Sequence, residues 1–391
     1  MNRFIPLSIP NFEGNENKYV NKALSQRWVS TGGSYIVEFE KKLADYLHID
    51  NIAACQSGTA ALHLSLVESG VSPGDMVIVP TLTFIAAVNP VKYQFAEPVF
   101  IDCDDSLCID PQKVKYFCEE ECSFNAGKLI HKKSGRYVKA IIVVHVFGNM
   151  VDMESIMGIA GKFNLKVIED ATEALGTYYT KGKYKGKFAG TIGDFGAYSF
   201  NGNKIITTGG GGAITSNNSK IVDHLRYLTT QSKDDPLYYL HNEIGFNYRM
   251  TNLQAALGVA QMEELSEFVK RKNKNYRLYL SLLQDFEYGK LLSFREGTYS
   301  NRWFYSLEVD MSKVKKTMRD IIVLLESRGI QTRTVWGLIH EQLPYKNAYT
   351  FMIEKAPYYS SCILNLPSST HITEEDIRYV VMQIKLVFKE L

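Results

Sequence analysis

The sequence predicts an α/β protein with a large domain, built on a mostly parallel sheet covered by helices, and a smaller C-terminal α/β domain. The first observation is that short apolar runs, such as Ile52–Cys55 and Met76–Pro80, alternate with helical patterns. Such runs are typical of strands that helices bury on both faces of a parallel sheet. The second observation is a long helical pattern from Thr251 to about Phe286, followed by shorter elements. We therefore expect a large domain at residues 1–260 and a small domain at 261–391.

Two helical patterns precede the first strand. One carries apolar and aromatic residues from Tyr19 to Trp28, and the second begins near Phe39 and reaches Leu47. Trp28 also allows a second interpretation, as an aromatic side chain of the core. The other elements of the large domain are helices at 57–62, 84–93 and up to 163, strands at 98–102, 140–147 and 165–168, and an irregular polar stretch at 119–139.

The small domain is expected to contain further elements of both kinds. Strand-like patterns cover Trp303–Val309 and Ser361–Leu366, and helical patterns cover Lys313–Arg328 and Glu374–Phe388. No Pro- or Gly-rich linker divides the two halves of the sequence. We therefore expect the long helix to connect the two domains.

Charge and composition exclude several classes of protein. Lysine and arginine number 44 and aspartate and glutamate 42, so the formal net charge is only +2. Nothing in this balance attracts the whole protein to nucleic acid or to an anionic membrane. The first residues lack the apolar core of a signal peptide, and no apolar run is long enough to span a bilayer. We expect a cytoplasmic protein.

The six cysteines form no Cys-x-x-Cys pair, which favours free thiols over zinc ligands or disulfides. Cys118, Cys122 and His131 lie near one another in the sequence, but their spacing is poor for a metal site. We expect no metal.

One lysine stands alone in an apolar and glycine-rich stretch. Lys204 follows an apolar run that predicts a buried strand at Phe195–Phe200, and no other charge lies between Asp194 and Lys220. A lone lysine is most often a solvated surface charge. A lysine held among apolar groups, however, gives up its proton more readily and becomes a usable nucleophile. The surroundings of Lys204 thus meet the requirement for a Schiff-base lysine.

A candidate anion site lies where the first strand ends and a helix begins. Ser57, Gly58 and Thr59 occupy this turn, where free backbone N–H groups and the helix dipole favour an anion such as a phosphate. The hydroxyls of Ser57 and Thr59 could add donors. The alternative is that Ser57 only caps the helix.

Two further residues follow strand ends, where ligands bind in open α/β sheets. Asp170 ends a buried strand and could pair with a protonated ring nitrogen, or it could cap the next segment. Phe84 could stack on a ring, or it could belong to the core. A phosphate site, a ring partner, a stacking aromatic and a Schiff-base lysine are what a protein contributes to a pyridoxal phosphate (PLP) site.

The sequence resembles the sugar-nucleotide aminotransferases of the DegT/DnrJ/EryC1/StrS group, which are fold type I PLP enzymes. The resemblance covers nearly the whole chain. It rests on six motifs in the same order, namely Trp28-Val-Ser-Thr-Gly32, Ser57-Gly-Thr-Ala-Ala-Leu62, Thr83-Phe84, Glu169-Asp170-Ala-Thr-Glu173, Ser199-Phe-Asn-Gly-Asn-Lys204 and Gly245-Phe-Asn-Tyr-Arg-Met250.

The resemblance implies a role for each matched position. Lys204 would carry the cofactor covalently and, when freed, move protons, and Asp170 would pair with the pyridine nitrogen. Phe84 would cover one face of the ring, and Glu173 would contact the ring hydroxyl. The phosphate would be held by Ser57, Gly58, Thr59, Ser199 and Asn247. Because Asn247 would come from the neighbouring subunit, the resemblance also implies a homodimer with shared active sites.

Within the group, the sequence is most similar to transaminases that make UDP-linked 4-amino-4,6-dideoxy-N-acetylglucosamine, a precursor of bacillosamine and legionaminic acid. The amino donor would be glutamate and the acceptor a nucleotide-linked 4-keto-6-deoxy sugar. The residues implied to contact substrate are Trp28, Ser30, Thr31, Arg333, Trp336 and Tyr345. The group often has Arg-Pro-Xaa-Trp where this sequence has Thr334 in place of the proline.

Three other functions share part of this sequence pattern. A transaminase of dTDP-linked 3- or 4-keto sugars differs only in its substrate and stays open. A PLP-dependent sugar 3-dehydratase shares the fold but replaces the lysine with histidine, so Lys204 counts against it. A DNA-binding regulator with PLP would need an additional winged-helix region, which the sequence does not supply.

Overall fold

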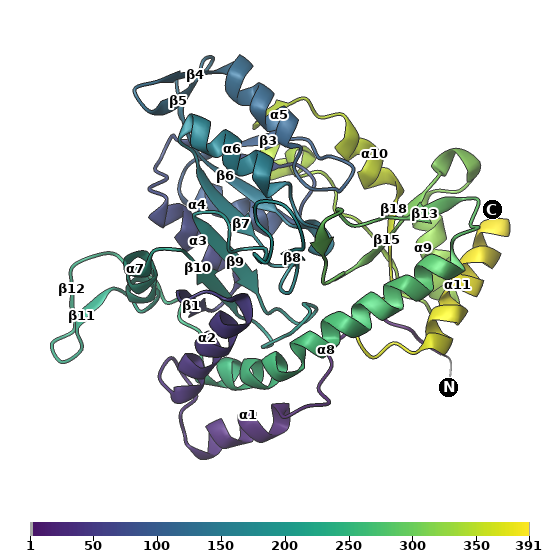
Figure 1. Cartoon of the computed structure of the whole chain (residues 1–391), viewed down its shortest axis with the longest axis horizontal. Helices are drawn as coiled ribbons and strands as arrows, with labels where there is room; N and C mark the ends of the chain where they lie inside the picture. The colour runs from purple at the N-terminus through teal and green to yellow at the C-terminus, as the bar shows by residue number, and fades with distance from the viewer. Residues whose placement is uncertain (1–2, 391) are drawn as a thin grey trace.

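A computed structural model describes residues 3–390, and it contains a large sheet with helices packed around it (Figure 1). From β9 to β17 every neighbouring pair runs parallel, and β10 is antiparallel to both of its neighbours, β1 and β9. The mostly parallel sheet is therefore confirmed. Across the sheet the strands are β1 (Ile52–Cys55), β10 (Gly212–Thr215), β9 (Phe195–Ser199), β7 (Lys166–Asp170), β6 (Tyr137–Val144), β2 (Met76–Pro80), β3 (Glu97–Ile101) and β17 (Tyr349–Phe351).

Helices cover this sheet because its strands are apolar on both faces. β2 and β1 are buried along their whole length, as expected from their continuous apolar runs. α3 packs against β9, β10 and β7 and is itself almost entirely buried. The helices of this part are α1 (Glu16–Ser25), α2 (Ser34–Leu47), α3 (Gly58–Glu68), α4 (Asn89–Tyr93), α5 (Pro111–Tyr116), α6 (Met153–Phe163) and α7 (Ser219–Thr229).

The polar stretch at 119–139 is not irregular, and this prediction was wrong. It contains a β-hairpin of β4 (Cys122–Asn125) and β5 (Lys128–His131), and β5 pairs antiparallel with the start of β6. The turn between them places Ala126 and Gly127 at φ values of 48° and 75°. Two-residue hairpin turns need positive φ at both central positions, which Asn-Gly or Asp-Gly usually supply. Because alanine stands at the first position, this turn carries no clear hairpin signal.

α8 (Asn252–Leu282) joins the large sheet to a second, smaller one. Its first turn is closed by a capping box between Thr251 and Gln254. The smaller sheet has the order β13 (Gly289–Leu291), β15 (Tyr305–Val309), β18 (Ile363–Leu366) and β16 (Arg333–Thr334), and α9 (Met318–Ser327) and α11 (Glu374–Lys389) accompany it.

Two separate hydrophobic cores support the division into two domains. The second core includes Tyr279 of α8, Tyr305 of β15 and Ile384 of α11, all fully buried. Ile5 from the start of the chain joins this core, and its backbone bonds to Gly329 and Gln331. The first described residues accordingly lie on the same side of the molecule as α11 (Figure 1). The boundary at residue 260 stays a prediction, since α8 passes through it without a break.

Smaller differences concern element ends. α1 ends at Ser25, and Trp28 is 60% exposed, so the interpretation of Trp28 as a core aromatic was wrong. Ser361 and Cys362 belong to α10 (Lys355–Cys362) rather than to the strand that follows. The remaining elements are β8 (Tyr178–Tyr179) with β14 (Thr298–Tyr299), β11 (Lys233–Asp235) with β12 (Leu240–His241), the 3-10 helices η1 (Ile85–Ala87), η3 (Val146–Gly148), η4 (Met311–Lys313), η5 (Ile339–Glu341) and η6 (Leu343–Tyr345), and the π-helical turn η2 (Phe117–Glu121).

Among residues 3–390, the helices that are long enough to span a bilayer are not apolar enough to do so.

Candidate active site

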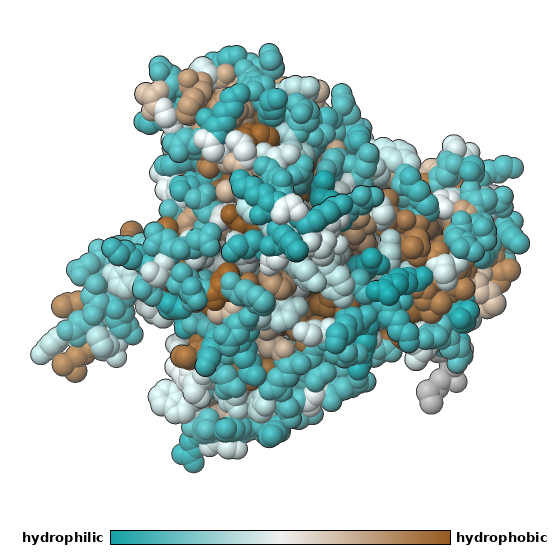
Figure 2. All heavy atoms as spheres, in the orientation of Figure 1, coloured by the Kyte–Doolittle hydropathy of each residue, from teal (hydrophilic) through white to brown (hydrophobic). Residues whose placement is uncertain are grey.

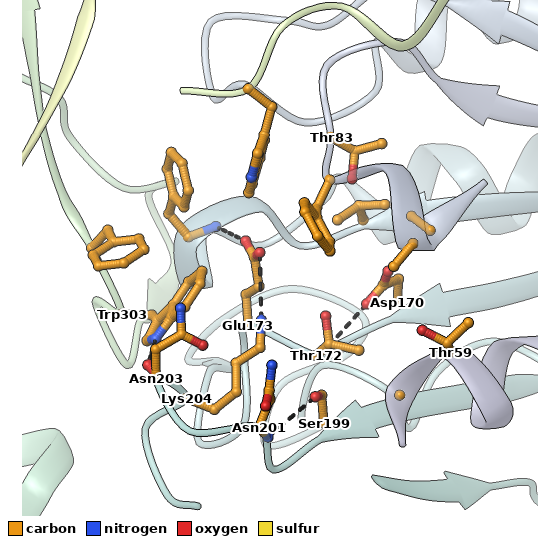
Figure 3. A pocket seen from close by; sticks show the side chains of 18 of the residues that line it. Thr59, Thr83, Asp170, Thr172, Glu173, Ser199, Asn201, Asn203, Lys204 and Trp303 are labelled. Carbon is orange, nitrogen blue, oxygen red and sulfur yellow. Dashed lines mark hydrogen bonds and ion pairs between the residues drawn. The ribbon is translucent and has the colours of Figure 1, made fainter. Parts of the chain in front are cut away.

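A cavity of about 520 Å³ opens at the edge of the large sheet where its parallel strands end (Figure 3). Asp170 ends β7 and Ser199 ends β9, and both line the cavity. The opposite wall comes from later in the chain and includes Trp303, Arg333 and Asn365. The cavity therefore lies between the large sheet and the small one, at the edge where ligands bind in open α/β sheets.

The start of α3 forms the end of the cavity suited to an anion. The hydroxyl of Ser57 accepts the N–H of Ala60 at 3.1 Å, so Ser57 does cap the helix. Gly58, Thr59 and Ser199 also line the cavity, next to the first N–H groups of α3, which have no acceptor within the helix. A Cβ on Gly58 would lie 2.9 Å from side-chain carbons of both Ser199 and Thr172, so only glycine allows this close approach. The cap of Ser57 is therefore compatible with an anion at the same turn, and phosphate binding there stays a prediction.

The two adjacent acids at the end of β7 have different tasks. Asp170 lines the cavity, is 4% exposed, and accepts the backbone N–H of Thr172 at 3.0 Å. Burial raises the pKa of its carboxyl group. Glu169 points the other way and is fully buried against the ring of His145, with 2.9 Å between Oε2 and Nε2. Its oxygens also accept the N–H groups of Gly190, Ile192 and Gly193. Glu169 therefore holds the 190–193 loop, and Asp170 is left to face a ligand.

Lys204 is not a solvated surface charge. Its side chain is 13% exposed, and its Nζ lies 3.7 Å from Oε1 of Glu173. On another side, Nζ lies 4.1 Å from the centre of the Trp303 ring (Figure 3). The amine is thus held between a carboxyl group and an aromatic face, within the cavity.

Glu173 is buried, and a backbone hydrogen bond fixes the orientation of its carboxyl group. Its Oε2 accepts the backbone N–H of Phe147 at 2.8 Å, which leaves Oε1 turned toward Lys204. Burial raises the pKa of Glu173 to about 7, although the nearby Lys204 ammonium acts in the opposite direction. This carboxyl group can therefore hold or release a proton near neutral pH. Contact between Glu173 and a ring hydroxyl stays a prediction.

Aromatic side chains form further walls. Phe84 is 53% exposed and lines the cavity, so it does not belong to the core. Phe147 and Trp336 also line it, and their ring centres lie 4.8 Å apart. A planar ligand could stack against such faces.

Arg333 brings a second cation to the cavity. It lies on β16, directly opposite Asn365 of β18, and its guanidinium is exposed apart from a bond to the carbonyl of Thr332. The charged groups along the wall are Lys204, Arg333, Asp170 and Glu173.

Five of the predicted site residues lie outside this cavity. Trp28, Ser30 and Thr31 are exposed on a loop that Asn252 ties to the start of α8. Tyr345 is 2% exposed and donates its hydroxyl to Asn89.

Asn247 is also outside the cavity. It is exposed, and its side-chain oxygen accepts from Gln231 at 3.1 Å. Its contact with a phosphate, like the substrate contacts of Trp28, Ser30, Thr31 and Tyr345, stays a prediction.

Sequence reasoning missed two residues that contact the predicted pair Lys204 and Glu173. From the sequence, Trp303 is predicted only as the first residue of a strand, and Phe147 only as the last residue of another. Phe147 has a left-handed backbone with φ of 54°, which no sequence pattern announced. Thr172 could have been predicted from the sequence, since it lies inside the motif that contains Asp170.

The cysteines take no part in the cavity. All six are free and buried. His131 lies 2.8 Å from the hydroxyl of Ser134 through its Nδ1. Across residues 3–390, no cluster of three or more His, Cys, Asp or Glu side chains is arranged to hold a metal ion.

Two named relatives align along nearly the whole chain. The GDP-perosamine synthase of Caulobacter vibrioides is 38% identical over 387 residues, covering 98% of this chain and 98% of that protein. The UDP-4-amino-4,6-dideoxy-N-acetyl-beta-L-altrosamine transaminase of Campylobacter jejuni is 27% identical over 393 residues, covering 96% and 95%.

The fold also matches a solved structure. A DegT/DnrJ/EryC1/StrS aminotransferase from Brucella abortus superposes with a TM-score of 0.84 at 28% identity, covering 95% of this chain and 94% of that one.

The residues of the cavity fit PLP. The start of α3, with the space that Gly58 leaves open, is suited to a phosphate. Asp170 is a buried carboxylate without a basic side chain bonded to it among the described residues, and it suits a positively charged ring nitrogen. Lys204 supplies the amine within the same cavity, and Phe84 supplies an exposed aromatic face.

The sequence model of one family matches residues 10–385, which is nearly the whole chain. The site geometry, the relatives and the solved structure agree with that match. This chain belongs to the DegT/DnrJ/EryC1/StrS aminotransferase family, as a sugar-nucleotide aminotransferase that uses PLP.

Proposed function

We propose that this protein transfers an amino group from glutamate to C4 of a nucleotide-linked 4-keto-6-deoxy sugar. The observation that carries the proposal is the position of Lys204, whose amine faces Glu173 and Trp303 in a cavity that also contains Asp170. When bound there, PLP accepts the amino group from the donor and passes it to the acceptor.

The side chains of the cavity have separate tasks in this proposal. Nζ of Lys204 takes a proton from the α-carbon of glutamate and, in the second half of the reaction, returns one to C4 of the sugar. Asp170 holds the positive charge of the ring nitrogen, and the N–H groups at the start of α3 hold the phosphate. Arg333 offers its guanidinium to the carboxylate of the donor or to the diphosphate of the sugar nucleotide.

The relatives support a 4-amino product but differ in the nucleotide. Perosamine is a 4-amino-4,6-dideoxy sugar, and the relative named for its GDP form is 38% identical to this chain. The relative named for a UDP-linked 4-amino sugar is 27% identical. We therefore take a GDP-linked acceptor as the first candidate. UDP-4-keto-6-deoxy-N-acetylglucosamine, with a place in bacillosamine or legionaminic acid synthesis, is the second, because of the sequence resemblance stated above.

The test is an acceptor series with glutamate as the donor. Purified protein loaded with PLP is given GDP-4-keto-6-deoxymannose, UDP-4-keto-6-deoxy-N-acetylglucosamine or dTDP-4-keto-6-deoxyglucose, and 2-oxoglutarate and the amino sugar are measured. We expect the highest kcat/KM with one of the first two acceptors and none with Lys204→Ala. If the protein aminated none of the three acceptors, the proposal would be overturned.

We also propose that two chains share each active site. The β11–β12 hairpin projects from the body of the molecule, and apolar side chains gather on it (Figures 1 and 2). Exposed apolar patches of this kind mark surfaces that another chain covers. The large exposed side chains of this region are Leu237, Tyr238, Tyr239, Leu240 and Ile244. Asn247 follows this hairpin in the sequence. A partner chain that buries the hairpin would therefore also lie close to Asn247.

A further inference from the structure

Trp303 contacts the amine of Lys204 and the backbone of the residue before it. The side chain is 4% exposed, and the centre of its ring lies 4.1 Å from Nζ of Lys204. Its indole Nε1–H donates to the carbonyl of Asn203 at 2.8 Å, directly before the lysine in the chain (Figure 3). A cation is attracted to the face of an aromatic ring, and most strongly to that of tryptophan. Trp303 is therefore placed to hold the Lys204 ammonium.

Trp303 belongs to a segment, residues 300–303, that α8 holds in place. Nζ of Lys272 donates to the carbonyl of Trp303 at 2.7 Å, and Nδ2 of Asn273 donates to the carbonyl of Ser300 at 2.9 Å. Lys272 is 2% exposed, and burial lowers the pKa of its amine to about 7. An amine donates to a carbonyl whether it is charged or neutral, so this contact persists across neutral pH.

A third contact with α8 fixes the residue just before Trp303. Arg302 has a φ of 50°, a left-handed conformation that is unusual for a side chain of this size. Its guanidinium lies over the ring of Tyr276, 3.9 Å from the centre. Tyr276 is four residues beyond Lys272, so the two lie on the same face of α8. Such a strained backbone persists only where its surroundings hold it.

The same segment fixes the other partner of Lys204. Nδ2 of Asn301 donates to the carbonyls of Glu173 and Leu175, both at 3.0 Å. A Cβ on Gly148 would lie 1.9 Å from Oδ1 of Asn301, so Asn301 fills its space completely. One short segment therefore positions both the ring and the carboxyl group that the Lys204 amine contacts.

We propose that Trp303 and Glu173 form the binding site of the Lys204 amine whenever it is free, and that Lys272 is a positioning residue that acts through Trp303. This inference rests on the proposed function, in which the amine is freed each time donor or acceptor occupies the cofactor, and the amine is equally free in the apo-protein. In this site Nζ can pass a proton to Oε1 of Glu173, so that an N–H bond breaks and an O–H bond forms. The amine that remains is neutral and able to accept a proton from substrate.

The first experiment follows covalent capture of PLP by the apo-protein, which requires no sugar. The rate is read from absorbance, and the adduct on Lys204 is confirmed by borohydride reduction and peptide mass. We expect Trp303→Leu to slow capture about tenfold, and Trp303→Phe, which keeps an aromatic face, to slow it by less than about threefold. An unchanged rate in Trp303→Leu overturns the inference. Equal slowing in both variants also overturns it, because it would indicate a purely structural role.

The second experiment tests the anchor. We expect Lys272→Met to slow capture about threefold to tenfold, and Lys272→Arg, which keeps a donor for the carbonyl, to recover most of the rate. Lys274→Met is the matched control, since Lys274 lies on the same helix, exposed and paired with Glu374. Its capture rate should equal that of the wild type. A wild-type rate in Lys272→Met would remove Lys272 from the inference.

These outcomes separate the inference from the proposed function. If the wild type captures PLP and depends on Trp303 but aminates no sugar nucleotide, the proposed function fails and the amine site stands. If the wild type aminates a sugar nucleotide while Trp303→Leu captures PLP at the normal rate, the amine site fails and the proposed function stands.

Discussion

Oε1 of Glu173 lies 3.7 Å from Nζ of Lys204, and both side chains are largely removed from solvent. The pair is asymmetric, because a backbone N–H of Phe147 fixes the second oxygen of Glu173. The carboxyl group thus cannot turn away from the amine without losing a hydrogen bond. Because burial raises the pKa of the Glu173 carboxyl group to about 7, the stability of the protein depends on pH.

The first prediction concerns the stability of the apo-protein. The pKa of Glu173 is raised to about 7 in the folded state from 4.5 in the unfolded one. Its contribution to stability is therefore present below about pH 4.5 and is lost as the pH rises through about 7. Glu173→Gln removes this loss, so its unfolding free energy relative to the wild type should increase by about 2–4 kcal/mol between pH 4.5 and pH 8.

Urea unfolding of both apo-proteins at several pH values measures this difference. A constant difference across the range would mean that Glu173 does not titrate there.

The second prediction concerns covalent chemistry. Lys204 contributes the amine in the cavity, so Lys204→Ala should fold and still bind pyridoxamine phosphate, while turnover falls by orders of magnitude. The absorbance of the covalently bound cofactor should disappear, and borohydride should no longer fix PLP to the chain. Turnover near the wild-type level in this variant would contradict the assignment of Lys204.

The third prediction concerns Asp170. Asparagine has nearly the same size but lacks the charge that keeps the ring nitrogen protonated, so Asp170→Asn should slow amino transfer by orders of magnitude. PLP should still attach to Lys204, because that reaction does not need the charge. Stopped-flow mixing of the loaded enzyme with glutamate separates the two steps. If the variant were nearly as fast as the wild type, another group would have to hold the ring nitrogen.

The fourth prediction concerns sharing of active sites between chains. An inactive Lys204→Ala chain is mixed with an inactive Asn247→Asp chain, whose added carboxylate should repel the phosphate. In a shared arrangement, one site of the mixed dimer combines Lys204 of the second chain with Asn247 of the first and regains activity. Self-contained sites give no recovery, since each chain keeps its own defect. The decisive measurement is the activity of a heterodimer purified through two different tags.

The strands were the most predictable part of the fold. β1 and β2 begin and end where their apolar runs do, because strands buried on both faces leave no polar positions to confuse the pattern. The hairpin at 122–131 escaped prediction because its turn uses Ala126 in a conformation that alanine rarely adopts. Its edge position also left β4 largely exposed, so that segment carried no strong apolar signal.

The candidate site was predictable only where chemistry follows a strand end. The local sequence indicates a chemical role for each of four residues, Lys204, Asp170, Ser57 and Phe84. Trp303 has none, since it reaches Lys204 across a hundred positions of sequence and through contacts with α8. Residues of this kind are placed by packing between distant segments, which periodicity does not report.

Ile5 has a consequence for the order in which the protein folds. Its N–H and carbonyl bond to Gly329 and Gln331, and its side chain completes a core that also contains Phe388. Ile5 therefore cannot be buried until residues 329–331, which lie far later in the sequence, are in place. Contacts between segments so far apart in sequence form slowly, because a long loop has to close first. Strands β1 to β10 of the large sheet can pair among themselves in the meantime, whereas the core of the smaller sheet closes only when both distant segments meet.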